Sequence, residues 1–211
     1  MKNWTFKKWN TILGWVVFAI AFITYLSTIE PNFSFWDCGE YISSAVKLEV
    51  THAPGAALFQ LIGAVAAIFG FGDPSKYSVI INAMSALFSA FTILFLFWTI
   101  THLVRRLLNK DFEEVTFTEE ISILFAGVIG ALSFTFSDTF WFSAVEGEVY
   151  SMASMFIALL VWLITKWENE YHEKDNERWL ILIFFITGLS VGVHMMCMLA
   201  IPAVCLIFYT K

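Results

Sequence analysis

The chain has 211 residues, of which 59% are hydrophobic and 14% carry a charge, and its formal net charge is −6. Soluble domains carry about 25% charged residues, so this composition excludes disordered, nucleic-acid-binding and ordinary soluble proteins. It predicts an all-α protein that crosses a membrane several times, because lipid satisfies no backbone group of an open sheet and no segment alternates with the period of two of a barrel strand. Cys38, Cys197 and Cys205 lack metal-ligand spacing and predict neither a disulfide framework nor a zinc site.

The first predicted span lies at about 11–29 and follows Lys2, Lys7 and Lys8, which alternate with tryptophans. Tryptophan favours the headgroup region and lysine the cytoplasmic side, so the pattern predicts an interfacial anchor with a cytoplasmic amino terminus. The apolar stretch is longer than the roughly 7–15 residues of a signal peptide, which argues against cleavage.

Further apolar segments follow with short connections, at about 53–70, 78–104, 119–137, 149–165 and 179–210. The last segment is too long for one untilted span at about 1.5 Å per residue, and Gly188, Gly192 and His194 interrupt it. It is therefore predicted to form either one broken helix or two helices.

The distribution of basic residues decides how the segment 53–70 is placed. If it crosses and the amino terminus is inside, Arg105, Arg106 and four further basic residues fall outside, against the positive-inside rule. If it enters and returns, only Lys47 and Lys76 of the 12 basic residues lie outside. The inverted protein, with every segment crossing, leaves four outside. We therefore predict a re-entrant helix at 53–70 and place residues 30–77 on the outer face.

The first motif on that face is Phe35-Trp36-Asp37-Cys38-Gly39-Glu40-Tyr41. Asp37 and Glu40 are three residues apart and share a face if a helix begins here. Acids beside aromatic residues favour a raised proton affinity, which suits a general base or a cation-assisted site. The alternative is structural, with Asp37 as a helix cap and Glu40 supporting the first turn.

The second motif places His52 before Pro54 and Gly55. A stiff backbone there would hold the imidazole for a hydrogen bond to a phosphate or to an acid. The alternative is an ordinary loop histidine at the membrane interface.

The third motif contains Glu146, Glu148 and Tyr150 at the expected start of an embedded helix. An acid there is costly, so it is a functional candidate, although the helix dipole also favours acids at this position. Glu146 and Tyr150 are four residues apart, so the tyrosine hydroxyl would orient the carboxylate. His194, at the expected helix break, lies on the same side.

Four stretches occur in a recognisable order, namely FWDCGEYI at 35–42, HAPGAALF at 52–59, AVEGEVYSM at 144–152 and GLSVGVHMM at 188–196. Together they resemble the polytopic GT-C glycosyltransferases, most closely their protein O-mannosyltransferase-like branch. The resemblance implies a GT-C-type bundle with juxtamembrane helices after the first span, and residues 1–211 would be the amino-terminal transmembrane portion of a longer protein. The chain departs from the branch at Ala53, where proline is usual.

The resemblance also implies an enzyme that moves mannose or another hexose, with inversion, from a polyprenyl-phosphate donor to a Ser or Thr hydroxyl of an exported polypeptide at the outer face. Asp37 would be the catalytic base and Glu40 completes its motif. The residues that would contact substrate are His52, Glu146, Glu148, Tyr150 and His194. No metal site is predicted, although carboxylates are able to hold a divalent metal.

Two other functions stay open at this stage. One is a transporter or channel subunit whose acids bind protons or substrate, and the other is a catalytically silent scaffold in an envelope complex. The expected partners are the lipid-linked sugar donor, the exported polypeptide and membrane lipids, without nucleic acid. In a bacterium the expected location is the inner membrane.

Overall fold

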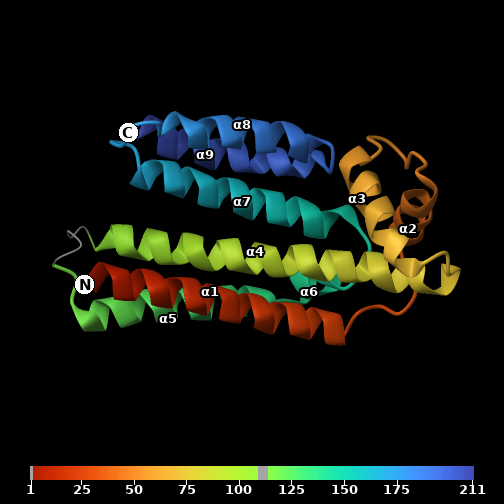
Figure 1. The fold of residues 1–211 in the computed structure, drawn as a ribbon, viewed down its shortest axis with the longest axis horizontal. Coiled ribbons are helices and arrows are strands. Elements are labelled where there is room, and N and C mark those ends of the chain that lie inside the picture. Colours follow the sequence, from red (N-terminus) through yellow and green to blue (C-terminus); the bar gives the residue numbers. More distant parts are fainter. Residues whose placement is uncertain (1, 109–113) are drawn as a thin grey trace.

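The computed structural model describes residues 2–108 and 114–211, and these form helices joined by loops, without a strand. Figure 1 shows the helices in chain order. The long ones are α1 (Lys2–Ser27), α4 (Tyr77–Leu107), α5 (Phe117–Thr135), α7 (Val149–Asn169) and α8 (Glu177–Val191). The short ones are α2 (Cys38–Lys47), α3 (Ala57–Ala67), η1 (Ile68–Gly70), η2 (Pro74–Lys76), α6 (Asp138–Ala144), η3 (Met195–Ala200) and α9 (Ile201–Tyr209).

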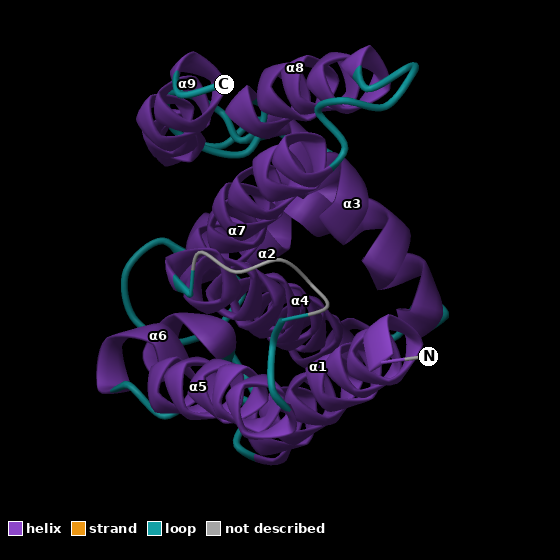
Figure 2. Ribbon diagram, turned by 90° about the vertical axis from the view of Figure 1, so that its left-hand side faces the viewer, coloured by secondary structure: helices purple, strands orange, loops and turns teal. Residues whose placement is uncertain are grey.

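Helix α4 is the centre of the bundle and packs against α1, α5 and α7. Figure 2, which looks along the bundle, shows α1 and α5 on one side of α4 and α7 on the other, with α8 and α9 beyond α7. Ala86 and Ala90 of α4 are fully buried against α1 and α5. Small side chains of this kind let helices approach closely in a membrane, where apolar burial alone gives no preference for a helix neighbour over lipid.

Four helices in the described part of the chain are long and apolar enough to cross a membrane. They cover Phe6–Ser27, Pro74–Leu107, Phe117–Thr135 and Val149–Asn169. The prediction of an all-α, polytopic helical bundle is confirmed.

The apolar segment 179–210 forms two helices that fold back on each other. Helix α8 ends at Val191, and the chain turns through Gly192 into η3 and α9. The carboxyl terminus returns to the end where α8 begins (Figure 1), and the Nζ of Lys211 lies 3.4 Å from Glu168 of α7. Of the two arrangements expected from the sequence, one broken helix or two helices, the structure has two helices, and they form a hairpin.

Helix α3 occupies most of the segment expected to be re-entrant. Its 11 residues would span about 17 Å at 1.5 Å per residue, too short to cross a membrane. It packs against α2 and α4 at one end of the bundle (Figure 1). A Cβ on Gly63 would lie 2.8 Å from the Cβ of Ala45, so glycine is what allows α3 to pack this closely on α2.

Charge separates along the bundle. Lys47 and Lys76 lie on α2 and η2, at the end that holds α3. The other described basic residues lie at the opposite end with both termini (Figure 1), which we call the basic end. Lys110, expected on the same side, lies outside the described residues.

Candidate active site

The loop between α1 and α2 is fastened to the bundle by a buried asparagine. The Nδ2 of Asn82, on α4, donates to the carbonyl oxygens of Glu30 at 2.7 Å and Asn32 at 2.9 Å. The amide of Glu30 donates to the carbonyl of Val145 at 3.1 Å, which ties this loop to the loop before α7. The two loops that carry the acidic motifs therefore form one surface.

Asp37 occupies the position before α2, but its side chain makes no capping hydrogen bond. The residue before it, Trp36, has a φ of 63°, a left-handed conformation that costs a non-glycine residue about 1–3 kcal/mol. The Asp37 carboxylate is 54% exposed, and its Oδ2 lies 3.9 Å from the Nε2 of His52. The structural alternative, in which Asp37 serves as a helix cap, does not describe this side chain.

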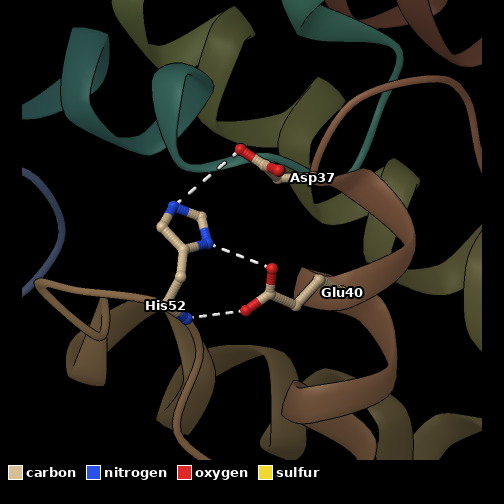
Figure 3. Close-up of side chains that lie close together, drawn as sticks. All are labelled: Asp37, Glu40 and His52. Carbon is tan, nitrogen blue, oxygen red and sulfur yellow. Dashed lines mark hydrogen bonds and ion pairs between the residues drawn. The ribbon is translucent and has the colours of Figure 1, made fainter.

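Glu40 holds His52 by two hydrogen bonds (Figure 3). The backbone N–H of His52 donates to Oε1 of Glu40 at 2.6 Å, and its Nδ1 lies 3.0 Å from Oε2. The ring of Tyr41 packs against the imidazole with ring centroids 5.8 Å apart. These contacts fix the imidazole so that Nε2 faces Asp37 (Figure 3).

The same contacts set the protonation of the pair. The hydrogen bond from the His52 backbone lowers the pKa of Glu40, with a further contribution from the imidazole. The Glu40 hydrogen bond raises the pKa of His52 above its ordinary value, and the charge of Asp37 adds to the effect. Glu40 is therefore charged at neutral pH, and His52 retains its proton to a higher pH than a free imidazole.

Glu146 and Glu148 are both buried in the loop between α6 and α7. Glu146 accepts a hydrogen bond from the hydroxyl of Ser34, in the first loop. Burial raises the pKa of Glu148 to about 7, with added repulsion from Glu146 and Asp37. The Oε1 of Glu148 has no hydrogen-bond partner among the described residues, so this buried acceptor is available to a ligand.

Helix α7 begins at Val149, with Glu148 as the residue before it. The expectation that Glu146 starts this helix is therefore wrong, and Glu146 does not share a helix face with Tyr150. Gly147 lets this loop lie close to α4, because a Cβ at this position would lie 2.9 Å from the Oδ1 of Asn82. The hydroxyl found on Glu146 is that of Ser34, on a different loop.

Tyr150 and His194 form the far side of the same surface, with ring centroids 5.7 Å apart. His194 lies in the turn after α8, where its Nδ1 accepts from the amide of Met196 at 3.1 Å. The amide of Leu58 donates to the carbonyl of Gly192 at 2.7 Å, so the second and fourth sequence motifs meet here.

Tyr41 links the two halves of the site. Burial raises its pKa to about 12, and the charges of Asp37, Glu148, Tyr150 and Glu40 add to the rise. The predicted site residues of all the motifs thus gather at one end of the bundle. Asp37, Glu40 and His52 form a contiguous cluster, and Tyr150 with His194 lies beside them without a direct hydrogen bond to that cluster among the described residues.

Asp37, Glu40 and His52 are also the described residues that could hold a metal ion, since one ligand atom from each lies within 4.8 Å of the others. Two carboxylates and one imidazole suit a divalent cation such as Mn²⁺ or Zn²⁺. The same three groups suit proton transfer, because a carboxylate, an imidazole and a second carboxylate lie in series.

Sequence reasoning missed two residues that build the site, Asn82 and Ser34. Asn82 is fully buried in a membrane-spanning helix, and its amide was the available signal, because a polar group at such a position needs partners. Ser34 carries no signal in the sequence, since its role depends on a loop that approaches it only in the fold.

Comparison with known proteins finds a matching family model and curated relatives. The family model described as "Protein O-mannosyl-transferase TMEM260 N-terminal domain" matches residues 37–211. Protein O-mannosyl-transferase tmem260 of Dictyostelium discoideum is 30% identical over 167 residues, which are 78% of this chain and 18% of that protein. Protein O-mannosyl-transferase TMEM260 of Mus musculus is 30% identical over 176 residues, 83% of this chain and 22% of that protein.

The chain thus spans about a fifth of the length of the curated relatives it matches. No solved structure matches it. The family model begins at Asp37 and includes every site residue predicted from the sequence. On this match, this chain belongs to the family of the protein O-mannosyl-transferase TMEM260 N-terminal domain.

Proposed function

We propose that this chain is part of a membrane glycosyltransferase that places a sugar on a protein. Both curated relatives are named protein O-mannosyl-transferases. The finer proposal is that mannose or another hexose passes from a polyprenyl-phosphate donor to a Ser or Thr hydroxyl of an exported polypeptide. By the positive-inside rule, the reaction takes place on the face opposite the basic end.

The observation that carries this proposal is the exposed Asp37 carboxylate, which makes no capping bond and lies 3.9 Å from an oriented imidazole. A general base needs an accessible, charged carboxylate within reach of the attacking hydroxyl. A helix-capping aspartate would have its oxygens turned toward the backbone amides of its own helix instead.

In the mechanism, Asp37 accepts the proton of the acceptor hydroxyl while that oxygen forms a bond to the anomeric carbon. The bond from this carbon to the phosphate oxygen breaks in the same step, and the polyprenyl phosphate leaves with the electron pair. One displacement of this kind inverts the anomeric configuration. His52 in its protonated form donates a hydrogen bond from Nε2 to the leaving phosphate and so balances its charge.

Two other features of the site suit this substrate pair. The unpartnered Oε1 of Glu148 is a buried acceptor for a sugar hydroxyl, and a sugar supplies several. Phe35 and Trp36, immediately before Asp37, are exposed and offer an apolar surface to a prenyl chain. The transporter alternative fits less well, because it needs acids near the middle of the membrane, whereas these lie in loops at one end of the bundle.

The test is transfer of labelled sugar from a polyprenyl-phosphate donor to acceptor protein, in membranes that contain the full-length protein. Asp37→Asn keeps the shape of the side chain and removes the base, so we expect transfer to fall about 10²- to 10⁴-fold. The matched control is Asp138→Asn, because Asp138 is also exposed, in the first turn of α6, and lies outside the cluster. Equal rates for Asp37→Asn and the unaltered protein would overturn the assignment of Asp37.

A further inference from the structure

A pocket lies at the basic end of the bundle, where α1, α4 and α7 meet. Its volume is about 290 Å³, and it shares no residue with the cluster around Asp37. Nothing in the proposed sugar transfer uses it. Any ligand of this pocket would therefore serve a role separate from sugar transfer.

The charge of the lining is positive. Lys7 of α1, Arg105 of α4 and Lys166 of α7 line the pocket, and no Asp or Glu within residues 2–108 and 114–211 does. Within the described ranges, neither Lys7 nor Lys166 forms an ion pair with a carboxylate. Like charges gathered around one pocket repel one another, and near a membrane the repulsion is less screened than in water. An anion in the pocket would remove that repulsion.

Nearby carboxylates are already engaged elsewhere. Glu168 of α7 lies 2.9 Å from the Nε2 of His102 and also pairs with Arg106 at 2.8 Å and Lys211 at 3.4 Å. Glu170 pairs with Arg178 at 2.6 Å. Of the cations that these acids pair with, His102 lines the pocket and the others do not, so among the described residues Lys7 and Lys166 are left without a carboxylate partner, and an anionic ligand would supply the balancing charge.

Aromatic rings form one wall of the pocket, against which an anionic ligand would pack. Trp98 and Trp162 stack with ring centroids 5.3 Å apart, and the Nζ of Lys166 lies 5.0 Å from the Trp162 ring centroid. The indole N–H of Trp98 donates to the backbone carbonyl of Asn10 at 3.2 Å. The side-chain Oδ1 of Asn10 is buried and has no hydrogen-bond partner in the described part of the chain, so the wall also offers an acceptor.

The lipid-facing surface of α1 beside the pocket is apolar. Ile12 and Trp15 of α1 are exposed just beyond Lys7 and Thr11, which line the pocket. Trp9 is exposed in the preceding turn, as expected for an aromatic residue at the headgroup level. A molecule with its phosphate in the pocket would therefore lay its acyl chains along α1, in the lipid.

We propose that this pocket binds the phosphate of an anionic glycerophospholipid, with Lys7, Arg105 and Lys166 on the phosphate and the Asn10 Oδ1 on a headgroup hydroxyl. Basic pockets between membrane-spanning helices on the cytoplasmic side are known to bind anionic lipid headgroups. Phosphatidylglycerol carries both groups, a phosphodiester and free hydroxyls. The bound lipid would join α1 to α7, both of which pack against α4.

The test is native mass spectrometry of the full-length protein, released from detergent with equal amounts of phosphatidylglycerol and phosphatidylcholine. We expect phosphatidylglycerol to be retained in preference, and Lys166→Gln to weaken its binding about fivefold, since a lysine near an anionic lipid contributes about 1 kcal/mol. Lys174→Gln is the matched control, because Lys174 is exposed at the same end and does not line the pocket. A melting curve for each variant checks that it is folded.

Equal retention of the two lipids, or equal loss with Lys174→Gln and Lys166→Gln, would overturn the proposal. Inorganic phosphate added as a competitor separates the two sources of the ligand. Displacement of phosphatidylglycerol at millimolar phosphate would assign the pocket to a soluble anion and overturn the lipid assignment. These measurements do not depend on sugar transfer, so they stand whether or not the proposed function holds.

Discussion

The stability contributed by the pairing of Glu40 with His52 depends on pH. The pKa of Glu40 is lowered, so its contribution to stability is present above its unfolded pKa and is lost as the pH falls through the lowered value. The pKa of His52 is raised, so its contribution is complete below its unfolded pKa and is lost as the pH rises through the raised value. The pair is therefore intact between the two shifted pKa values.

Glu40→Gln tests this pairing. The amide still accepts the hydrogen bond from the His52 backbone but carries no charge, so we expect the pKa of His52 to fall toward about 6.5. Histidine ring resonances followed by NMR through a pH titration of the full-length protein give the value. Glu49→Gln is the control, because Glu49 is an exposed acid in the loop that carries His52. A His52 pKa that stays raised in Glu40→Gln would show that another group holds the proton.

Glu148 should affect stability in the opposite direction from Glu40. Its pKa in the fold is about 7, above the ordinary 4.5, because the buried carboxyl favours its protonated form. The folded state then binds more protons than the unfolded state between these two values, so stability falls as the pH rises through them.

The variant Glu148→Gln removes this titration. We expect its melting temperature, relative to that of the unaltered protein, to increase steadily as the pH is raised from about 5 to about 8. Thermal unfolding in detergent at several pH values gives the comparison. A difference that does not change with pH would show that Glu148 titrates normally in the fold.

At the level of helices, the close packing of α2 on α3 holds Glu40 beside His52. Gly63→Ala would place a Cβ 2.8 Å from the Cβ of Ala45, which has no rotamer to relieve the contact. We expect the two helices to separate, with a loss of about 1–3 kcal/mol in the free energy of unfolding.

The matched control is Gly188→Ala in α8, where a Cβ would meet nothing within 4 Å. That change should be neutral or stabilising by up to about 1 kcal/mol, because alanine favours a helix over glycine. Chemical or thermal unfolding of both variants decides the matter. Equal stabilities for the two would mean that the contact between α2 and α3 is loose.

Helix boundaries show what sequence patterns could predict here and what they could not. The spans follow from the length of apolar runs, and the break near Gly192 follows from glycines in a run too long for one helix. The span predicted at about 149–165 begins where α7 does, but Glu146 was wrongly assigned to the helix start, because it satisfies the same helix-start pattern as Glu148. In the fold, Glu146 lies in the loop before α7, where Gly147 packs closely against Asn82.

At the scale of the molecule, the distribution of lysine and arginine makes a prediction about orientation. Glu49, in the loop between α2 and α3, and Lys174, in the loop between α7 and α8, are exposed, and Cys38 and Cys197 are buried. These two loops lie at opposite ends of the bundle (Figure 1). In a Cys205→Ser background, we expect Glu49→Cys to react with a membrane-impermeant maleimide in intact cells. Lys174→Cys should react only after permeabilisation.

Labelling of both positions from outside, or of Lys174→Cys alone, would contradict the proposed orientation. This orientation is predicted from the distribution of basic residues. The structure shows that most of them lie at one end of the bundle, and the positive-inside rule assigns that end to the cytoplasm. The sequence motifs named the acids and histidines that the fold gathers into the candidate site, because ionisable residues beside predicted spans are functional candidates. The supports of the site were not predictable, because Asn82 and Ser34 act on loops distant in sequence.

The hydrogen bond from the Leu58 amide to the Gly192 carbonyl has a consequence for biosynthesis. The ribosome makes Asp37, Glu40 and His52 early, but the acceptor that fixes the start of α3 emerges only after α8. Until then the Leu58 amide lacks this partner, and an unsatisfied amide is costly near lipid. The candidate site is therefore completed only after α8 and Gly192 have been made, and an arrested chain that ends before Gly192 carries the acids without the hydrogen bond that fixes the start of α3.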